Sequence, residues 1–94
     1  MKRFKEDLNT AIFTTRSILY KHEAIQFVFH HEEDGAWEFI GKGTYDEHDY
    51  IVISLEEIIK LDKSVLNIAD LPLGFEAFRS NLKSEWIIKK SSTD

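Results

Sequence analysis

The chain has 94 residues, of which 43% are hydrophobic, and its 12 basic and 17 acidic residues give a net charge of -5. This length fits one domain with a core of ordinary size, and the acidic balance argues against a nucleic-acid partner, which requires a concentrated positive face. Because the sequence contains no cysteine, disulfides, thiolate zinc sites and thiol catalysis are excluded.

The N-terminal stretch MKRFKEDLNTAIF begins with basic residues, but Lys5, Glu6 and Asp7 interrupt any apolar region that a secretory signal would need. No apolar run approaches the roughly 20 residues that a membrane span requires. We therefore expect a cytoplasmic protein with neither nucleic acid nor a membrane as a partner.

The predicted elements begin with short pieces. Residues 1–10 can form only a short amphipathic turn, and residues 11–15 are β-prone because they contain Ile12, Phe13 and two threonines. The segment 16–24 carries one apolar pair and predicts a helical turn or a connector.

Residues 25–30, IQFVFH, form the clearest strand. Alternation with period two places Ile25, Phe27 and Phe29 on one face and the intervening side chains on the other.

A second strand follows in AWEFIG, where Trp37 and Phe39 share a face. Between the two strands, Asp34-Gly35 is a strong turn signal because glycine accepts the positive φ of a tight turn. The stretch from His30 to Phe39 therefore predicts a β-hairpin with an acidic tip.

The second half begins with an acidic loop over residues 41–49, followed by YIVIS at residues 50–54. Because that run is almost continuously apolar, it predicts a central strand covered on both faces. Ser54 and Glu57 form a capping box that starts a helix, and Asp62 predicts the cap of a second short helix.

The chain then breaks at Pro72 and Gly74. Phe75, Phe78 and Leu82 recur at positions i, i+3 and i+7 and predict a last short helix. EWIIKK predicts a closing strand.

Together these elements predict a single α+β domain over residues 1–94, in which residues 1–10 and 91–94 are frayed. We expect a mostly antiparallel sheet of four or five strands, with short helices mainly in the C-terminal half.

Metal binding is the first chemistry to weigh, because histidines and acids concentrate in residues 30–34 and 46–49. A zinc site needs three or four converging ligands, whereas His30 and His31 point to opposite faces of a strand. The DEHD segment lacks the alternating oxygen ligands and central glycine of a calcium loop. Solvated acidic loops explain the pattern better, so we expect no resident metal or cofactor.

No catalytic residue is predicted, and we expect a non-enzyme. The acids lie in solvated runs rather than as a pair with one buried member, and the Gly-x-Gly at residues 41–43 is too short for a phosphate loop. No GxSxG elbow is present, and the serines at positions 17, 54, 64 and 80 are expected to lie at helix caps or within helices.

The two tryptophans and one arginine are given structural roles. Trp37 alternates with Phe39, and Trp86 with Ile88, which predicts that both tryptophans are core anchors. Arg79 follows an apolar stretch and is expected to form an ion pair with an acidic loop.

The order of these motifs resembles a group of small bacterial proteins. Between residues 11 and 86 the chain runs FVFHHEEDGAWEFIGKG, an acidic loop, VISLEEIIKLDKSVLNIADLPLGFEAFR and a final tryptophan. This order is similar to that of the bacterial domain of unknown function 2185, part of which is grouped with the immunity proteins of polymorphic toxin systems. The chain departs from the pattern at Ala36, where glycine often directly precedes the tryptophan, and at Lys63, where proline is common. The shared residues look architectural, so no binding or catalytic residue is carried over.

The acidic balance, the lack of a catalytic constellation and the resemblance favour a non-enzymatic protein-interaction module. The resemblance implies an immunity protein that binds and blocks a toxin. We expect a basic partner, whose association would be steered by carboxylates that also form rim contacts. These are Glu32, Glu33 and Asp34 at the hairpin tip and Asp46, Glu47 and Asp49 in the next loop.

Two alternatives stay open. One is a small-ligand or divalent-metal-binding domain that uses His30 or His31, His48 and the nearby acids. The other is an accessory domain that dimerises through a sheet edge. The sequence indicates neither the identity of the partner nor the oligomeric state.

Overall fold

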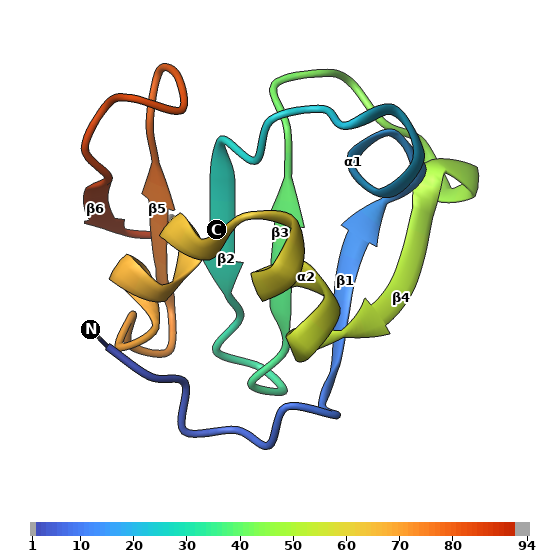
Figure 1. The fold of residues 1–94 in the computed structure, drawn as a ribbon. Helices are drawn as coiled ribbons and strands as arrows, with labels where there is room; N and C mark the ends of the chain where they lie inside the picture. The colour runs from blue at the N-terminus through green and yellow to red at the C-terminus, as the bar shows by residue number, and fades with distance from the viewer. Residues whose placement is uncertain (1, 92–94) are drawn as a thin grey trace.

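Six short strands form one mixed sheet within residues 2–91, the part of the chain that the computed structural model describes (Figure 1). The order across the sheet is β4-β1-β3-β2-β5-β6. The strands are β1 (Ala11–Thr15), β2 (Phe27–His30), β3 (Trp37–Ile40), β4 (Tyr50–Ser54), β5 (Phe75–Phe78) and β6 (Ile87–Lys90). Two α-helices, α1 (Arg16–Lys21) and α2 (Leu55–Leu61), and two 3-10 helices, η1 (Glu47–Asp49) and η2 (Lys63–Ile68), complete the elements of residues 2–91.

The fold is α+β, as expected, but the sheet differs in detail from the expectation. It has six strands rather than four or five, and β1 pairs with β3 in parallel while the other neighbours are antiparallel. A parallel pair needs a crossover between its strands, and here α1 and β2 lie between β1 and β3 in the chain. This crossover inserts β1 between β3 and β4.

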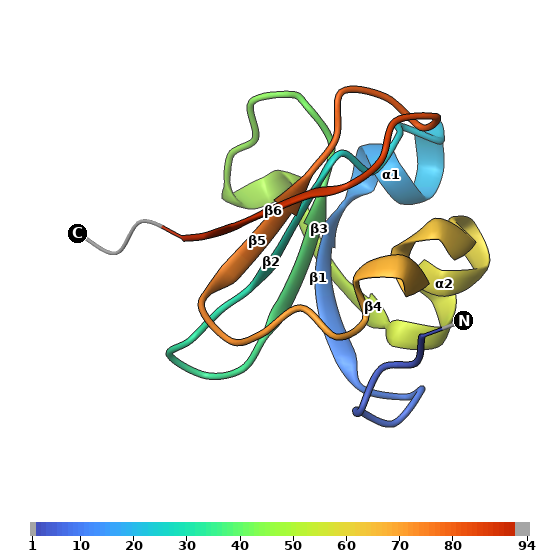
Figure 2. The same cartoon turned by 90° about the vertical axis from the view of Figure 1, so that its left-hand side faces the viewer.

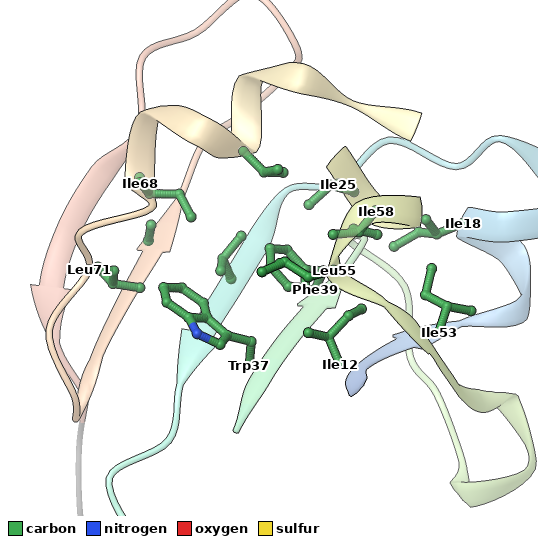
Figure 3. Packing of buried hydrophobic residues seen from close by; sticks show 13 residues of the cluster. Ile12, Ile18, Ile25, Trp37, Phe39, Ile53, Leu55, Ile58, Ile68 and Leu71 are labelled. Atoms are coloured by element: carbon green, nitrogen blue, oxygen red, sulfur yellow. The ribbon is translucent and has the colours of Figure 1, made fainter. Parts of the chain in front are cut away.

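The hydrophobic core lies between the sheet and the helices α1, α2 and η2. Alternation along each strand sends one set of side chains to this side, where Ile12, Val28, Phe39 and Ala77 are completely buried. Figure 3 shows side chains from the helices meeting this layer, Leu55 and Ile58 among them. Trp37 lies in the same layer, with 2% of its surface exposed, so its predicted role as a core anchor is confirmed.

The predicted cap of α2 is present with both of its hydrogen bonds. The Glu57 backbone N–H donates to Ser54 Oγ at 3.1 Å, and the Ser54 N–H donates to Glu57 Oε1 at 3.0 Å. Asp62 caps η2 by accepting the Ser64 N–H at 2.9 Å. These caps satisfy backbone donors that would otherwise lack partners.

The expectation that YIVIS forms a central strand covered on both faces was wrong. Among the strands of residues 2–91, β4 lies at the edge of the sheet and pairs only with β1. Ile53 is 8% exposed, whereas Val52, on the opposite face, is 57% exposed. The continuous apolar run therefore marks a strand with apolar side chains on both faces, only one of which is covered.

The helix predicted from Phe75, Phe78 and Leu82 was also wrong, because residues 75–78 form strand β5, antiparallel to β2. Gly74 has a positive φ of 81° and donates its N–H to His30 O at 2.8 Å. This hydrogen bond places the residues that follow Gly74 beside β2. In a strand, residues three apart face opposite ways. Accordingly Phe75 packs against the core, while Phe78 lies on the other face.

The chain ends were expected to fray. Residue Phe4 packs its ring edge-on against Trp37, with centroids 5.0 Å apart. Of the residues expected to fray, Met1 and residues 92–94 lie outside the described range.

No helix among residues 2–91 has the length and apolar character needed to cross a bilayer.

Candidate functional site

One face of the sheet carries no α-helix within residues 2–91, and we call it the open face (Figure 2). In Figure 2 the sheet is seen nearly edge-on, with α1 and α2 on its other side. The open face comprises the outward side chains of all six strands, among them Phe13, Phe27, Phe29, Glu38, Val52, Glu76, Phe78, Ile87 and Lys89.

The open face is largely apolar and exposed. Phe13 is 43% exposed, Val52 57% and Ile87 55%. Near its centre, the Phe27 ring stacks on Phe29 and on Phe78, with centroids 6.5 Å and 6.3 Å apart. These contacts fix the three rings as one aromatic layer.

A single row of directly paired residues crosses the open face through its middle. Phe29 on β2 is paired with Glu38 on β3 and with Glu76 on β5. Beyond Glu38 the row continues to Phe13 on β1 and Val52 on β4, and beyond Glu76 it ends at Lys89 on β6. The row thus places one aromatic ring between two carboxylates.

Both carboxylates of this row are shielded from solvent and have basic neighbours. The side chain of Glu38 is 19% exposed and lies 2.7 Å from His31 Nε2, and that of Glu76 is 17% exposed and lies 3.9 Å from Lys89 Nζ. Burial and the negative charge of Glu38 raise the pKa of Tyr50, so that phenol is neutral at physiological pH.

The two predicted acidic segments lie at opposite ends of the sheet and do not meet. The hairpin tip precedes β3 and the loop over residues 41–49 follows it, so the length of β3, about 13 Å at 3.3 Å per residue, lies between them. Figure 2 shows the later loop bulging toward the open side of the sheet and the tip beyond the sheet's other end.

Several of the acids in these segments hold local backbone structure. Asp34 accepts the Ala36 N–H at 2.9 Å within the turn. Asp46 and Asp49 form a capping box on η1. Glu32, Glu33 and Glu47 are exposed, and within residues 2–91 no hydrogen bond to a neighbour is found for them. Within these two segments, those three side chains are the acids without a role in local backbone structure.

The histidines do not converge on one point. His30 faces the core side and contacts Leu71 O through Nδ1 at 2.7 Å, whereas His31 lies on the open face beside Glu38. His48 belongs to η1 at the other end of β3. Within residues 2–91, no three histidine, aspartate or glutamate side chains are grouped to hold a metal ion.

A cleft of about 730 Å³ lies beside His30, between the N-terminal segment and residues 69–73. Its polar groups centre on Glu6, whose Oε2 accepts the Trp37 indole N–H at 2.9 Å and lies 3.8 Å from His30 Nε2. The His30 ring stacks on Trp37 with centroids 3.9 Å apart. Trp37 and Leu71 are each only 2% exposed, whereas Leu73, which also lines the cleft, is 52% exposed.

Arg79 has the structural role that was expected, but with another partner. Its Nη2 pairs with Asp62 at 2.7 Å, the residue that caps η2, rather than with either acidic loop. The guanidinium is 1% exposed and lies over the Trp86 ring, 4.0 Å from the centroid.

The aromatic layer of the open face was not among the predicted site residues. The sequence did carry a signal for it. A strand that is covered on one face needs apolar side chains on that face only, whereas this hairpin has apolar side chains on both faces. Phe27 and Phe29 alternate with the core residue Val28. Which of the two sets would be covered depended on where the helices packed.

Comparisons with known proteins add no family assignment: no family model, no curated protein and no solved structure matches the chain.

Proposed function

We propose that the protein is a non-enzymatic protein-interaction module that binds a basic partner on the open face. The observation that carries this proposal is the uncovered sheet face, with exposed Phe13, Val52 and Ile87 around the aromatic layer. Large contiguous apolar patches are rare on monomers and mark sites of interaction. Aromatic side chains are also enriched at the centres of protein interfaces.

The charge of the chain supports a basic partner. The net charge is -5, and the exposed acids Glu32, Glu33 and Glu47 lie beyond the two ends of the open face. Rim charges of this kind act on the rate of association more than on final affinity. If the family resemblance holds, the partner is a toxin that the protein blocks.

The proposal is tested by affinity capture from the source cells with matched baits. The bait with Phe13→Ser and Val52→Ser loses apolar contact area on the open face, and we expect it to lose its partner. The control bait with Tyr20→Ser and Leu82→Ser loses side chains that are 66% and 57% exposed elsewhere. Partner recovery that is the same for the two baits would refute the open face as the docking surface.

Once a partner is identified, the role of the acidic segments is measured by stopped-flow binding. Glu32→Gln, Glu33→Gln and Glu47→Gln together are expected to slow association and to reduce its dependence on salt, with little change in dissociation. A change confined to the dissociation rate would contradict a steering role.

A second candidate function is small-ligand or divalent-metal binding at the cleft beside His30. The observation in its favour is the pairing of Glu6 with the Trp37 indole and His30 at the cleft wall. Calorimetric titration with zinc, calcium and manganese tests the metal form of this proposal. Binding heat that His30→Asn abolishes would support it, and absence of heat at micromolar metal would refute it.

A further inference from the structure

Strand β4 lacks the charged and proline residues that commonly keep an edge strand from pairing with another chain. Its sequence, YIVIS, contains no charge, no proline and no glycine. The opposite edge strand, β6, carries Lys89 and Lys90, and lysines on an edge oppose such pairing. In Figure 1, β4 runs along the outer edge of the sheet, with η1 at its start. Of the two edges, β4 is therefore the one suited to accept a further strand.

The pairing with β1 decides where the backbone groups of β4 point. The Leu55 N–H donates to Thr10 O at 2.8 Å, and in an antiparallel pair such bonded positions alternate with positions whose N–H and C=O point away from the partner strand. The register places Val52 at one of these outward positions. Ser54 is another, and its N–H donates to Glu57 Oε1 at 3.0 Å. Within residues 2–91 no turn or loop bond uses the Val52 N–H or C=O, so both are open to a strand outside the sheet.

Carboxylates flank this uncharged edge at both ends. Because the Ser54 N–H points outward, its hydrogen bond places the Glu57 carboxylate on the outer side of β4, at the end of the strand. At the start of β4, η1 contributes the carboxylates of Glu47 and Asp49. Arg16 is bonded to η1 through its Nε and offsets only part of this negative charge. The edge therefore has an apolar centre between two negative ends.

This charge pattern distinguishes a basic partner from a second copy of the chain. Two copies paired antiparallel through β4 would set the η1 acids of each beside Glu57 of the other, and a parallel pair would set identical acids together. Both arrangements bring like charges close, which is unfavourable. A strand that is apolar at its centre and carries lysine or arginine at both ends meets opposite charge at each end.

From this geometry we infer that the partner protein adds an extended segment to the outer edge of β4 as a seventh strand. The inference rests on the proposed function and specifies how the basic partner docks. The backbone of the segment exchanges hydrogen bonds with Val52, and every second side chain continues the open face beyond Val52 and Phe13. Basic residues at the two ends of the segment pair with Glu57 and with the η1 acids.

The chemistry of the segment is tested by titrating isotope-labelled protein with a peptide of alternating valines and threonines that carries lysines at both ends. Amide NMR follows the titration, and we expect saturable shifts at the Ile51, Val52 and Ile53 amides. A matched peptide with glutamates in place of the lysines is expected to bind about tenfold more weakly. Equal binding of the two peptides, or no saturation of these shifts up to about 10 mM, would overturn the inference.

The backbone pairing is tested by N-methylation of the lysine peptide. In an added strand, one alternate set of peptide N–H groups faces β4 and the other set faces solvent. Methyl groups on the facing set are expected to weaken binding about tenfold, and those on the other set less than about twofold. Equal affinity of the two methylated peptides would show that no strand is added.

The edge itself is tested with two variants of the full chain at one position. Val52→Pro removes the outward N–H and keeps an apolar side chain, and proline is tolerated on edge strands where the N–H faces solvent. We expect it to weaken binding of the lysine peptide about tenfold, whereas Val52→Thr, which keeps the donor, should cost less than about threefold. Equal affinity of Val52→Pro and the unmodified chain would overturn the inference.

The flanking charges are tested with a matched pair of double variants. Glu47→Gln with Glu57→Gln is expected to weaken binding of the lysine peptide about threefold, because glutamine preserves the cap of α2 and removes the charge. Asp70→Asn with Glu85→Gln removes the same charge from exposed positions away from β4 and should leave affinity unchanged. An equal loss in that control would reduce the effect to net charge and overturn the role of the two ends.

Further outcomes separate this inference from its foundation. If Val52→Pro fails to fold, judged by the dispersion of its amide spectrum, the N-methylated peptides decide the question. Shifts of the β4 amides that grow with protein concentration alone would identify a second copy as the occupant and overturn the inference. If cellular capture is lost with the bait that carries Phe13→Ser and Val52→Ser but kept with a Val52→Pro bait, the proposed function stands and strand addition falls. The reverse result would support strand addition and refute docking on the open face.

Discussion

At the scale of single residues, Arg79 joins parts of the chain that are far apart in sequence. Its Nε and Nη2 donate to Ile25 O at 3.1 Å and 3.0 Å, and its Nη1 donates to Ser64 Oγ at 2.7 Å. With the Asp62 pair and the Trp86 stack, this side chain links the segment before β2, η2 and the segment before β6. Such a buried cation is stable only because every donor group has a nearby acceptor or ring.

The first prediction concerns this network. Arg79→Met should lower the free energy of unfolding by about 3–5 kcal/mol, because it leaves the Asp62 carboxylate without its buried partner. Arg79→Lys keeps the charge but not the forked donors to Ile25 O, and should cost about 1–2 kcal/mol.

Urea unfolding followed by tryptophan fluorescence measures both changes. The matched control is Lys83→Met, at an exposed position, with an expected change below about 0.5 kcal/mol. A loss of under about 1 kcal/mol in Arg79→Met would mean that the network contributes little.

At the scale of elements, short helices depend on their ends. Helix α2 has only seven residues, from Leu55 to Leu61, and isolated helices of this length are not stable in water. Two features hold it: the buried side chains of Leu55 and Ile58, and the capping box at Ser54. The sequence pattern predicted both, because caps and helical spacing are local.

The second prediction is that Ser54→Ala lowers the free energy of unfolding by about 1 kcal/mol, since the Glu57 N–H loses its acceptor. Thr44→Ala, in the exposed loop before η1, serves as the control. Thermal unfolding of Ser54→Ala, Glu57→Ala and the double variant forms a cycle. Because the two side chains act together, the losses of the two single variants should sum to more than the loss in the double variant. A sum equal to the loss in the double variant would argue against a coupled capping box.

Strand β5 is the element that local reasoning missed. The spacing of Phe75 and Phe78 fits one face of a helix, but the same two residues are three apart in a strand and serve two faces. The decisive contact was not local: β2 offered an unpaired edge, and Gly74 directs the chain onto it through His30 O. No periodicity within residues 75–82 contains that information.

At the scale of the whole molecule, the sheet order separates stable from labile strands. β3 and β2 lie in the middle, whereas β4 and β6 form the edges. All four residues of β6 are exposed, and within the described part of the chain this strand pairs only with β5. Local opening should therefore begin at β6 rather than in the centre of the sheet.

The third prediction follows from that order. In native-state hydrogen exchange, the amides of β2 and β3 that pair within the sheet should exchange near the rate set by global unfolding. Those of β6 should exchange much faster, through local opening. Equal protection of β6 and β3 would show that an additional contact covers this edge, and sedimentation at the same concentration would identify self-association as its cause.

The sequence predicted some features of the candidate site, and the strand order decided others. The acidic residues at 32–34 and 46–49 were located correctly as a hairpin tip and a loop, yet the tertiary structure places them at opposite ends of β3. Sequence alone left open whether they form one cluster, and the order and direction of the strands answered that question. The row through Phe29 likewise exists only because β2 lies between β3 and β5.

By itself, the sequence determined what depends on neighbours along the chain: the Asp34-Gly35 turn, the caps at Ser54 and Asp62, and the alternation of Phe27, Val28 and Phe29. The prediction that Ile25 shares the face of Phe27 and Phe29 was wrong, because β2 begins at Phe27 and Ile25 is buried in the core. Only the tertiary structure decided that β4 is an edge, that residues 75–78 form a strand and that one sheet face is uncovered. The physical reason is that alternation assigns residues to two faces but does not say which face the helices will bury. That choice is made by pairing and packing between distant segments, and here it leaves Phe13, Val52 and Ile87 exposed on the open face.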